Sequence, residues 1–340
     1  MVINIQENIS LKKYNTFGIE ANARYFAKFK SIEELNDLLK HKNFIGVPTI
    51  ILGGGSNVLF TKNFDGLVLI NEIKGIEIVN EDNNRVHIKS GAGEVWNDLV
   101  IFCINNNWGG IENLSLIPGT VGASPMQNIG AYGVEIKDVF HSLTALEKET
   151  GQLKIFHKKD CEFGYRESVF KKQLRDKYII IDVTFELLKN PQLNTSYGAI
   201  TEVLNQMNIE TPTIRDVSAA VCQIRTSKLP NPKDIGNAGS FFKNPEISEE
   251  QYFELQKLFE NIPSYPTKNG FVKVPAGWLN EQCGWKGKRL GNYGVHKNQA
   301  LVLVNYGNAD GYDIYLLSEA IKKSVKEKFN ITLETEVNIL

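Results

Sequence analysis

The chain has few cysteines and no long apolar run, and both absences limit what it can be. Its 340 residues include four cysteines, Cys103, Cys161, Cys222 and Cys283, with no C-x-x-C pair. This spacing argues against a disulfide framework and a zinc site, so we expect four reduced thiols. No stretch approaches the roughly 18 apolar residues of a membrane span, and residues 1–7 lack the basic-then-apolar pattern of a signal peptide. The sequence therefore predicts a cytoplasmic protein that does not enter a membrane.

The chain also lacks an excess of charge of either sign. Its formal net charge is −1 at pH 7, and proteins that bind nucleic acid or anionic membranes usually carry a basic face, so we expect neither partner. The five histidines show no metal-ligand spacing, and the P-loop, complete Rossmann and G-x-S-x-G motifs are missing. These gaps argue against a P-loop nucleotidase, a Rossmann dinucleotide site, a serine hydrolase and metal catalysis.

Glycine, in contrast, is concentrated in two segments. The first glycine segment, residues 53–57, reads Gly-Gly-Gly-Ser-Asn between two apolar runs and predicts a hairpin or a phosphate nest. The second glycine segment, residues 116–133, contains four glycines among small, mostly uncharged residues. Such segments let the backbone approach a bulky anionic ligand with N–H groups and hydroxyls as donors. Two of them predict a long cofactor.

Apolar periodicity predicts an α+β fold, and the length of 340 residues predicts two or three domains. The expected helices cover residues 32–39 behind a Ser31 cap, 94–106, 216–225, 248–259 and 313–329. The expected strands include residues 66–70, 85–89 and 178–187. The polar residues 190–197 predict an exposed excursion with a domain boundary nearby.

Six segments together resemble one family of flavoenzymes. They are residues 14–18, 53–57, 116–133, 161–166, 236–245 and 333–337, and they span nearly the whole chain. In this order they are similar to the UDP-N-acetylenolpyruvoylglucosamine reductases (MurB), and Ser196-Tyr197-Gly198 resembles the tyrosine loop of the longer, type I members. The resemblance implies an FAD-binding domain of the vanillyl-alcohol-oxidase (PCMH) type and a C-terminal α+β substrate-binding domain.

The resemblance also implies domain limits and ligands. Residues 1–66 are expected to form the N-terminal lobe of the FAD-binding region and 67–214 its second lobe, the whole region covering about 16–188. Residues 215–328 would bind the UDP-sugar, and 329–340 would form a C-terminal strand that carries Glu336. The implied ligands are non-covalent FAD, NADPH as hydride donor and the small-molecule substrate UDP-N-acetylglucosamine enolpyruvate, bound by a monomer.

The FAD-binding residues implied by the resemblance all lie in the two glycine segments. They are Gly53, Gly54, Gly55, Ser56, Asn57, Pro118, Gly119, Thr120, Gly122, Ala123, Gln127, Asn128, Gly130, Ala131, Tyr132 and Gly133.

Reduction of an enolpyruvyl ether needs a hydride, stabilisation of the negative charge that develops toward the carboxylate, and a proton donor. Flavin N5, reduced beforehand by NADPH, can be the source of the hydride, and the resemblance implies its delivery to C3 of the enolpyruvyl group. The resemblance assigns charge stabilisation to Arg166 and Glu336 and protonation of C2 to Ser240. From their types alone, the three residues could equally be a surface arginine, a solvent-facing carboxylate and a turn serine.

Further residues are implied to bind the substrate. Lys228 and Arg225 are candidates for the diphosphate, and Tyr197 would close over the nucleotide-sugar. Asn244 and Gln299 offer amide groups to the uridine and diphosphate, although either could be a turn residue that satisfies its own backbone.

Two features depart from the family pattern: residues 124–126, and a chain end only four residues after Glu336, which could leave that residue weakly held. Two other functions stay open on the sequence. One is a different FAD oxidoreductase of the same superfamily, although no histidine or cysteine for covalent flavin attachment lies between Gly53 and Gly66. The other is a non-catalytic nucleotide-sugar binding protein, which would lack flavin absorbance.

Overall fold

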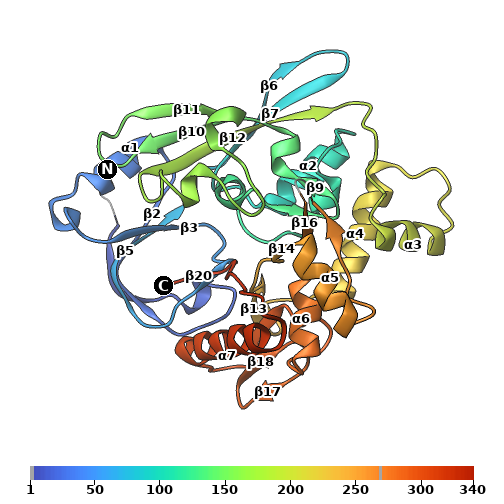
Figure 1. Cartoon of the computed structure of the whole chain (residues 1–340). Helices are drawn as coiled ribbons and strands as arrows, with labels where there is room; N and C mark the ends of the chain where they lie inside the picture. The colour runs from blue at the N-terminus through green and yellow to red at the C-terminus, as the bar shows by residue number, and fades with distance from the viewer. Residues whose placement is uncertain (1–3, 268–269) are drawn as a thin grey trace. The chain divides into compact units, whose positions relative to one another are not determined.

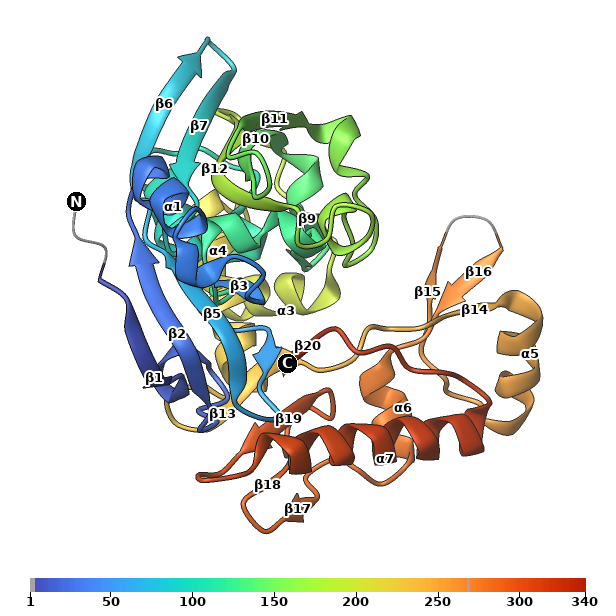
Figure 2. The same ribbon diagram turned by 90° about the vertical axis from the view of Figure 1, so that its left-hand side faces the viewer.

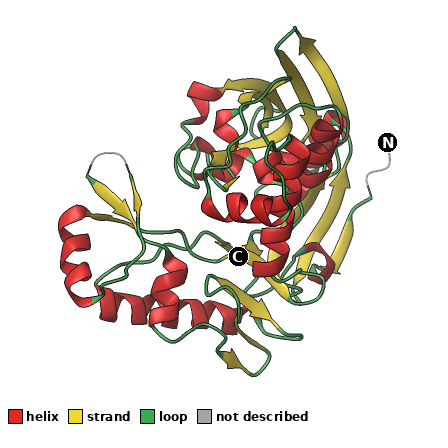
Figure 3. Cartoon of the chain, turned by 90° about the vertical axis from the view of Figure 1, so that its right-hand side faces the viewer, coloured by secondary structure: helices red, strands yellow, loops and turns green. Residues whose placement is uncertain are grey.

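The computed structural model describes residues 4–267 and 270–340, and the chain forms two compact units (Figure 1). Unit 1 takes the described part of Met1–Ile9 together with Ala23–Gly54 and Asp65–Ser227. Unit 2 takes Ser10–Asn22, Gly55–Phe64 and Lys228–Leu340. Helices and strands occur in both units (Figure 3), which confirms the α+β class. The predicted limits of the FAD-binding region and of the substrate-binding domain stay predictions.

One sheet of unit 1 has the strand order β1-β2-β5-β3. Its strands are β1 (Gln6–Ser10), β2 (Asn22–Phe29), β5 (Phe64–Asn71) and β3 (Thr49–Leu52). Helix α1 (Ile32–Leu39) begins after Ser31, whose hydroxyl accepts the Glu34 N–H, and it buries Leu35 and Leu38. The capped helix predicted here is confirmed.

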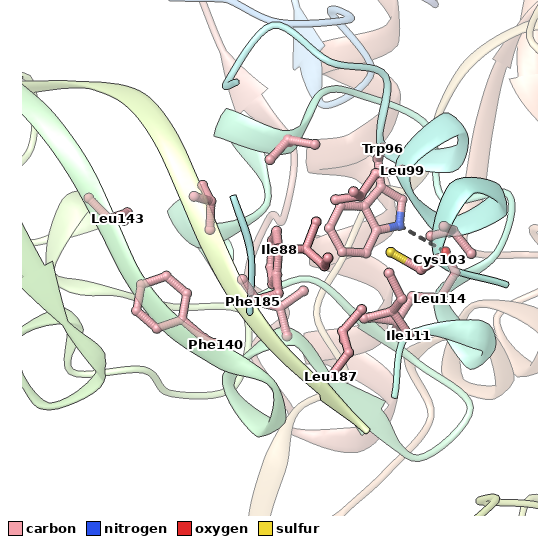
Figure 4. Packing of buried hydrophobic residues seen from close by; sticks show 14 of the residues in the cluster. Ile88, Trp96, Leu99, Cys103, Ile111, Leu114, Phe140, Leu143, Phe185 and Leu187 are labelled. Atoms are coloured by element: carbon pink, nitrogen blue, oxygen red, sulfur yellow. Dashed lines mark hydrogen bonds between the residues drawn. The ribbon is translucent and has the colours of Figure 1, made fainter. Parts of the chain in front are cut away.

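The other large sheet of unit 1 is antiparallel, with the order β11-β10-β12-β7-β6. Its strands are β6 (Ile76–Glu81), β7 (Arg85–Gly91), β10 (Phe140–Glu147), β11 (Leu153–His157) and β12 (Tyr178–Leu188), and β6 and β7 extend as a two-stranded ribbon in Figure 2. Helix α2 (Trp96–Asn105) packs on this sheet, where Trp96 meets Phe185 edge to face (Figure 4). The Trp96 indole N–H donates to the Leu114 carbonyl at 2.9 Å, which fastens the helix to the chain that leads into the second glycine segment.

Unit 1 also contains α3 (Gly198–Gln206) and most of α4 (Ile214–Lys228). Helix α4 has 15 residues and extends beyond the helix predicted over 216–225 at both ends. Helix α3 was not predicted, and it follows directly on the polar excursion.

In the residues that the structure describes, unit 2 contains three sheets and three α-helices. One sheet has the order β13-β19-β18-β17 and another the order β14-β16-β15. The strands are β13 (Gly236–Ser240), β14 (Glu246–Ser248), β15 (Tyr265–Pro266), β16 (Phe271–Lys273), β17 (Arg289–Leu290), β18 (Tyr293–Val295) and β19 (Val302–Asn305). The helices are α5 (Glu249–Leu258), α6 (Ala276–Gln282) and α7 (Gly311–Phe329), and α7 runs along β18, β19 and α6 (Figure 2).

The third sheet of unit 2 corrects two expectations. The first glycine segment does lie between two strands, β3 and β4 (Val58–Leu59), yet these do not form a hairpin. Strand β3 pairs with β5, whereas β4 pairs in parallel with β20 (Asn338–Ile339) at the end of the chain. Strand β20 begins after Glu336, so the predicted strand over 329–340 is reduced to two residues.

In the two described ranges, no helix combines the length and the apolar character that crossing a bilayer requires.

Candidate active site

Gly53 and Gly54 of the first glycine segment lie against the second glycine segment within unit 1. A Cβ on Gly53 would collide with the Thr120 hydroxyl, and one on Gly54 would lie 3.0 Å from the Gly119 Cα. Gly54 is exposed and Gly119 is half-buried, so bare backbone of both segments borders solvent. Backbone without side chains is what a large anionic cofactor needs in order to approach closely, and the arrangement fits FAD.

Part of the second glycine segment already uses its N–H groups inside the protein. It turns twice as 3-10 helix, over Val121–Ala123 and Pro125–Gln127. The Gly122 N–H donates to the Ala92 carbonyl at 2.9 Å, and the Ala123 N–H donates to Thr120 at 3.1 Å. Any contact of Gly122 or Ala123 with FAD would therefore use their carbonyl oxygens or carbon atoms rather than these donors.

Arg166 lies in a tight turn beside the second glycine segment. The turn is closed between Gly164 and Glu167, where the Gly164 N–H donates to the Glu167 carbonyl at 3.1 Å. Arg166 itself has a φ of +53°, and its guanidinium donates to the Gly130 carbonyl. A Cβ on Gly130 would lie 3.1 Å from Arg166 Nη1, so the glycine leaves space for the guanidinium.

Tyr132 of the second glycine segment forms a cluster with Tyr197 and Arg225. The rings of Tyr132 and Tyr197 meet edge to face with centroids 5.2 Å apart, and the Tyr132 hydroxyl is hydrogen-bonded to Arg225 on α4. Burial raises the pKa of Tyr132, and the charge of Arg225 opposes that rise. Because a neutral phenol does not cancel the charge of a guanidinium, Arg225 can still attract a phosphate.

Ser240 ends strand β13 in unit 2, directly after an irregular pairing. The register of β13 against β19 shifts between Asn237 and Ser240, and Gly239 has a φ of +71°. The buried Asn237 side chain accepts the Gly239 N–H at 3.0 Å and donates to the Pro230 and Ile235 carbonyls. The shape of the backbone before Ser240 therefore depends on Asn237, which sequence reasoning did not single out although it precedes Gly239 by two residues.

The Glu336 segment pairs with the residues that follow Ser240. The Glu336 N–H donates to the Phe241 carbonyl at 2.9 Å, and Thr335 bridges to Phe242. The structure thus brings two of the three predicted catalytic residues onto neighbouring backbones within unit 2, while Arg166 belongs to unit 1. The two residues that follow Ser240, Phe241 and Phe242, are both buried.

The chain end is fastened to the first glycine segment. The Asn57 amide donates to the Glu336 carbonyl at 3.2 Å, and the Leu340 carbonyl accepts hydrogen bonds from the N–H and hydroxyl of Thr61 at 2.8 Å each. The short tail does not leave the segment after Glu336 unpaired, because the Asn338 N–H donates to the Asn57 carbonyl at 3.1 Å and the Leu340 N–H donates to the Leu59 carbonyl at 2.9 Å. Glu334 points elsewhere: it is 72% exposed and pairs with Lys243.

Of three further residues predicted to bind the substrate, one is exposed and two accept backbone hydrogen bonds within the protein. Lys228 is exposed at the end of α4. The Asn244 side-chain oxygen accepts the Ala276 N–H at 2.9 Å, which caps α6, and the Gln299 oxygen accepts the Leu301 N–H at 3.3 Å. The amide nitrogens of Asn244 and Gln299 are the groups that substrate binding would use.

The four cysteines are free thiols, and burial raises the pKa of Cys103 and of Cys161 to about 12. Across residues 4–267 and 270–340, no three histidine, cysteine or acidic side chains come together as a possible metal site.

Two family models match the chain. The FAD binding domain model matches residues 23–156, and the C-terminal domain model of UDP-N-acetylenolpyruvoylglucosamine reductase matches residues 231–340. The UDP-N-acetylenolpyruvoylglucosamine reductase of Flavobacterium johnsoniae is 52% identical over 339 residues, covering 99% of this chain and all of that relative. This chain belongs to the UDP-N-acetylenolpyruvoylglucosamine reductase family.

Other members of the reductase family agree. The reductase of Pseudomonas syringae pv. tomato is 48% identical over 339 residues, covering 100% of both chains. The crystal structure of the reductase from Thermus caldophilus, at 21% identity, has the same fold with a TM-score of 0.70 over 99% of each chain. Membership in the reductase family rules out both alternatives, a different flavin oxidase and a binding protein without flavin.

Proposed function

We propose that Arg166, Ser240 and Glu336 carry out the reaction of this chain on its nucleotide-sugar. As a member of the reductase family, the chain is an NADPH-dependent FAD enzyme, UDP-N-acetylmuramate dehydrogenase (EC 1.3.1.98). It reduces the enolpyruvyl group of UDP-N-acetylglucosamine enolpyruvate in peptidoglycan precursor synthesis. The observation that supports the assignment most directly is the pairing of the Ser240 and Glu336 segments.

The two glycine segments would hold FAD, and the bound cofactor would supply the hydride for C3 of the enolpyruvyl group, with NADPH as its source. The chain's residues have to manage the charge and the proton. Arg166 would engage the substrate carboxylate through parallel N–H bonds, and Glu336, in its protonated form, would donate a further hydrogen bond. Both bonds strengthen as negative charge develops toward the carboxylate, which lowers the barrier.

Ser240 would then protonate C2. A serine hydroxyl is a weak acid, so the transfer needs an environment that excludes water and favours the departing proton. The buried Phe241 and Phe242 exclude water on one side, and the Asn237-braced turn fixes the Ser240 backbone.

The substrate-binding role of Arg225, Lys228, Asn244 and Gln299 is part of the same proposal. It is supported by the cationic character of the first two and by the amide groups of the others. We also propose that the enzyme works as a cytoplasmic monomer, without nucleic acid or membrane partners, because NADPH is a cytoplasmic reductant and the chain has no net charge excess.

Purified protein should be yellow and should release its flavin on denaturation. We expect acid precipitation to leave FAD in the supernatant, because no histidine or cysteine that could form a covalent link lies between Gly53 and Gly66. The measurement is the flavin absorbance of pellet and supernatant. Flavin that stays with the precipitated polypeptide would contradict non-covalent binding.

Tyr197→Phe should weaken binding of the UDP-sugar and leave the FAD content unchanged. If the hydroxyl reaches a phosphate, its loss costs about 1.5–3 kcal/mol, the value of a hydrogen bond to a charged group. Titration calorimetry on the oxidised holoenzyme measures this loss directly. Tyr312→Phe is a matched control, since Tyr312 is an exposed tyrosine of α7 that no part of the proposal uses. Equal affinity in Tyr197→Phe and wild type would remove the hydroxyl from substrate binding.

A further inference from the structure

Asn128 ties three separate stretches of unit 1 together. It is fully buried and has a φ of +45°, in the left-handed region that asparagine tolerates. Its amide donates to the Gly164 carbonyl at 2.9 Å, and its oxygen accepts the Lys137 N–H at 3.1 Å. Because the amide nitrogen and oxygen both bond to backbone and the side chain is buried, it faces the protein interior rather than a ligand.

The turn that Asn128 holds is the turn of Arg166. A non-glycine residue with a φ near +50° costs about 1–2 kcal/mol, so the turn needs support from outside. That support comes from the second glycine segment: Asn128 binds Gly164 on one side of Arg166, and the Ser168 hydroxyl donates to the Met126 carbonyl at 2.7 Å on the other. The guanidinium itself donates to Gly130 in the same segment.

We propose that Asn128 is a positioning residue for Arg166, which fixes the left-handed turn and thereby aims the guanidinium at the substrate. The inference rests on the proposed role of Arg166. It differs from the cofactor-binding role expected for Asn128, since a side chain that contacts FAD would affect both half-reactions, whereas a residue that aims Arg166 affects only the one in which the substrate is reduced.

Asn128→Asp in the holoenzyme separates these roles. The substitution keeps the size, the left-handed preference and the acceptor for Lys137, and it replaces the donor to Gly164 by a carboxylate oxygen facing a carbonyl. We expect stopped-flow oxidation of the reduced enzyme by the enolpyruvyl substrate to slow by about 10- to 100-fold, as for a misplaced catalytic group. FAD content and the rate of reduction by NADPH should stay within about twofold of wild type, since neither involves Arg166.

Asn71→Asp is the matched control. Asn71 is also a buried asparagine of unit 1 whose amide donates to a backbone carbonyl, Ile180, and whose oxygen accepts a backbone N–H, Ile73, both at 3.0 Å. It lies outside the glycine segments and the Arg166 turn, so any general effect of a buried carboxylate should appear there. A comparable slowing of substrate-dependent oxidation in Asn71→Asp would overturn the proposal.

A double-mutant cycle with Arg166→Lys decides the coupling. If Asn128 acts through Arg166, the double variant is slower than Arg166→Lys alone by no more than about threefold, because the two changes disable one interaction. The proposal would be overturned if the rate losses of the two single variants multiplied in the double variant. It would also be overturned if Asn128→Asp had a normal oxidation rate while Arg166→Lys was slow. A normal rate in Arg166→Lys would instead refute the proposed function itself.

Asn128→Gly covers the case in which the aspartate variant fails to fold. Glycine keeps the left-handed conformation and removes both side-chain bonds without adding a charge. The same selective loss supports the proposal. Loss of FAD or of the folded state in both variants would show that Asn128 maintains the whole glycine segment, and the positioning role would be wrong.

Discussion

Ser240→Ala should slow oxidation of the reduced enzyme by the enolpyruvyl substrate by about 10²- to 10⁴-fold, the range for loss of a general acid. Reduction of the flavin by NADPH should be nearly unchanged, because no proton reaches C2 in that half-reaction. Stopped-flow absorbance of the flavin follows each half-reaction separately. An unchanged second half-reaction would remove Ser240 from the mechanism.

Ser240→Cys provides a conservative comparison for the same step. A thiol is a stronger acid than a hydroxyl and occupies nearly the same volume, so this variant should recover part of the rate that alanine loses. Equal rates for the cysteine and alanine variants, with intact FAD content, would contradict the assignment of the transferred proton to the side chain at position 240.

Glu336→Ala should reduce the same substrate-dependent step by about 10²- to 10³-fold, as when one preorganised donor to a developing anion is removed. Glu336→Gln should lose less, because the glutamine amide still donates a hydrogen bond at that position. The measurement is again single-turnover oxidation of reduced enzyme. Identical losses in the two variants would contradict a donor role for Glu336.

The chain offers a close control for Glu336 two residues away. Glu334 lies on the same extended segment, is largely exposed and pairs with Lys243 at 3.2 Å. Surface ion pairs of this kind contribute about 0–1 kcal/mol, so Glu334→Gln should leave both half-reactions and the folded state near wild type. A loss in Glu334→Gln equal to that in Glu336→Ala would mean that the segment as a whole, rather than the Glu336 carboxyl, is responsible.

Local signals predicted much of the secondary structure. The Ser31 cap, the apolar stripes of α2 and α7, and the strands β5, β7 and β12 follow from residues close together in the sequence. The two glycine segments were also recognisable, because glycine is concentrated in residues 53–57 and 116–133. The close approach of Gly54 to Gly119 agrees with the absence of side chains at these two positions.

What the sequence could not predict depends on distant partners. Strand β4 has two residues and pairs with the last strand of the chain, so neither carries a periodic pattern of its own. The roles of Asn128 and Asn237 are equally hidden, because an asparagine that holds a remote carbonyl has the same local sequence as a turn asparagine.

The pairing of β4 with β20 also sets an order of events during biosynthesis. Asn57 and its partner Glu336 are 279 positions apart, and at about 5–20 residues per second the ribosome needs about 14–56 s to make the intervening chain. For that interval the Gly55–Phe64 stretch lacks its parallel partner, and the pairing of β4 can form only after Asn338 and Ile339 have emerged. Nascent chains halted before Glu336 would therefore expose an unpaired strand edge, which makes them targets for chaperones and proteases rather than partly active enzyme.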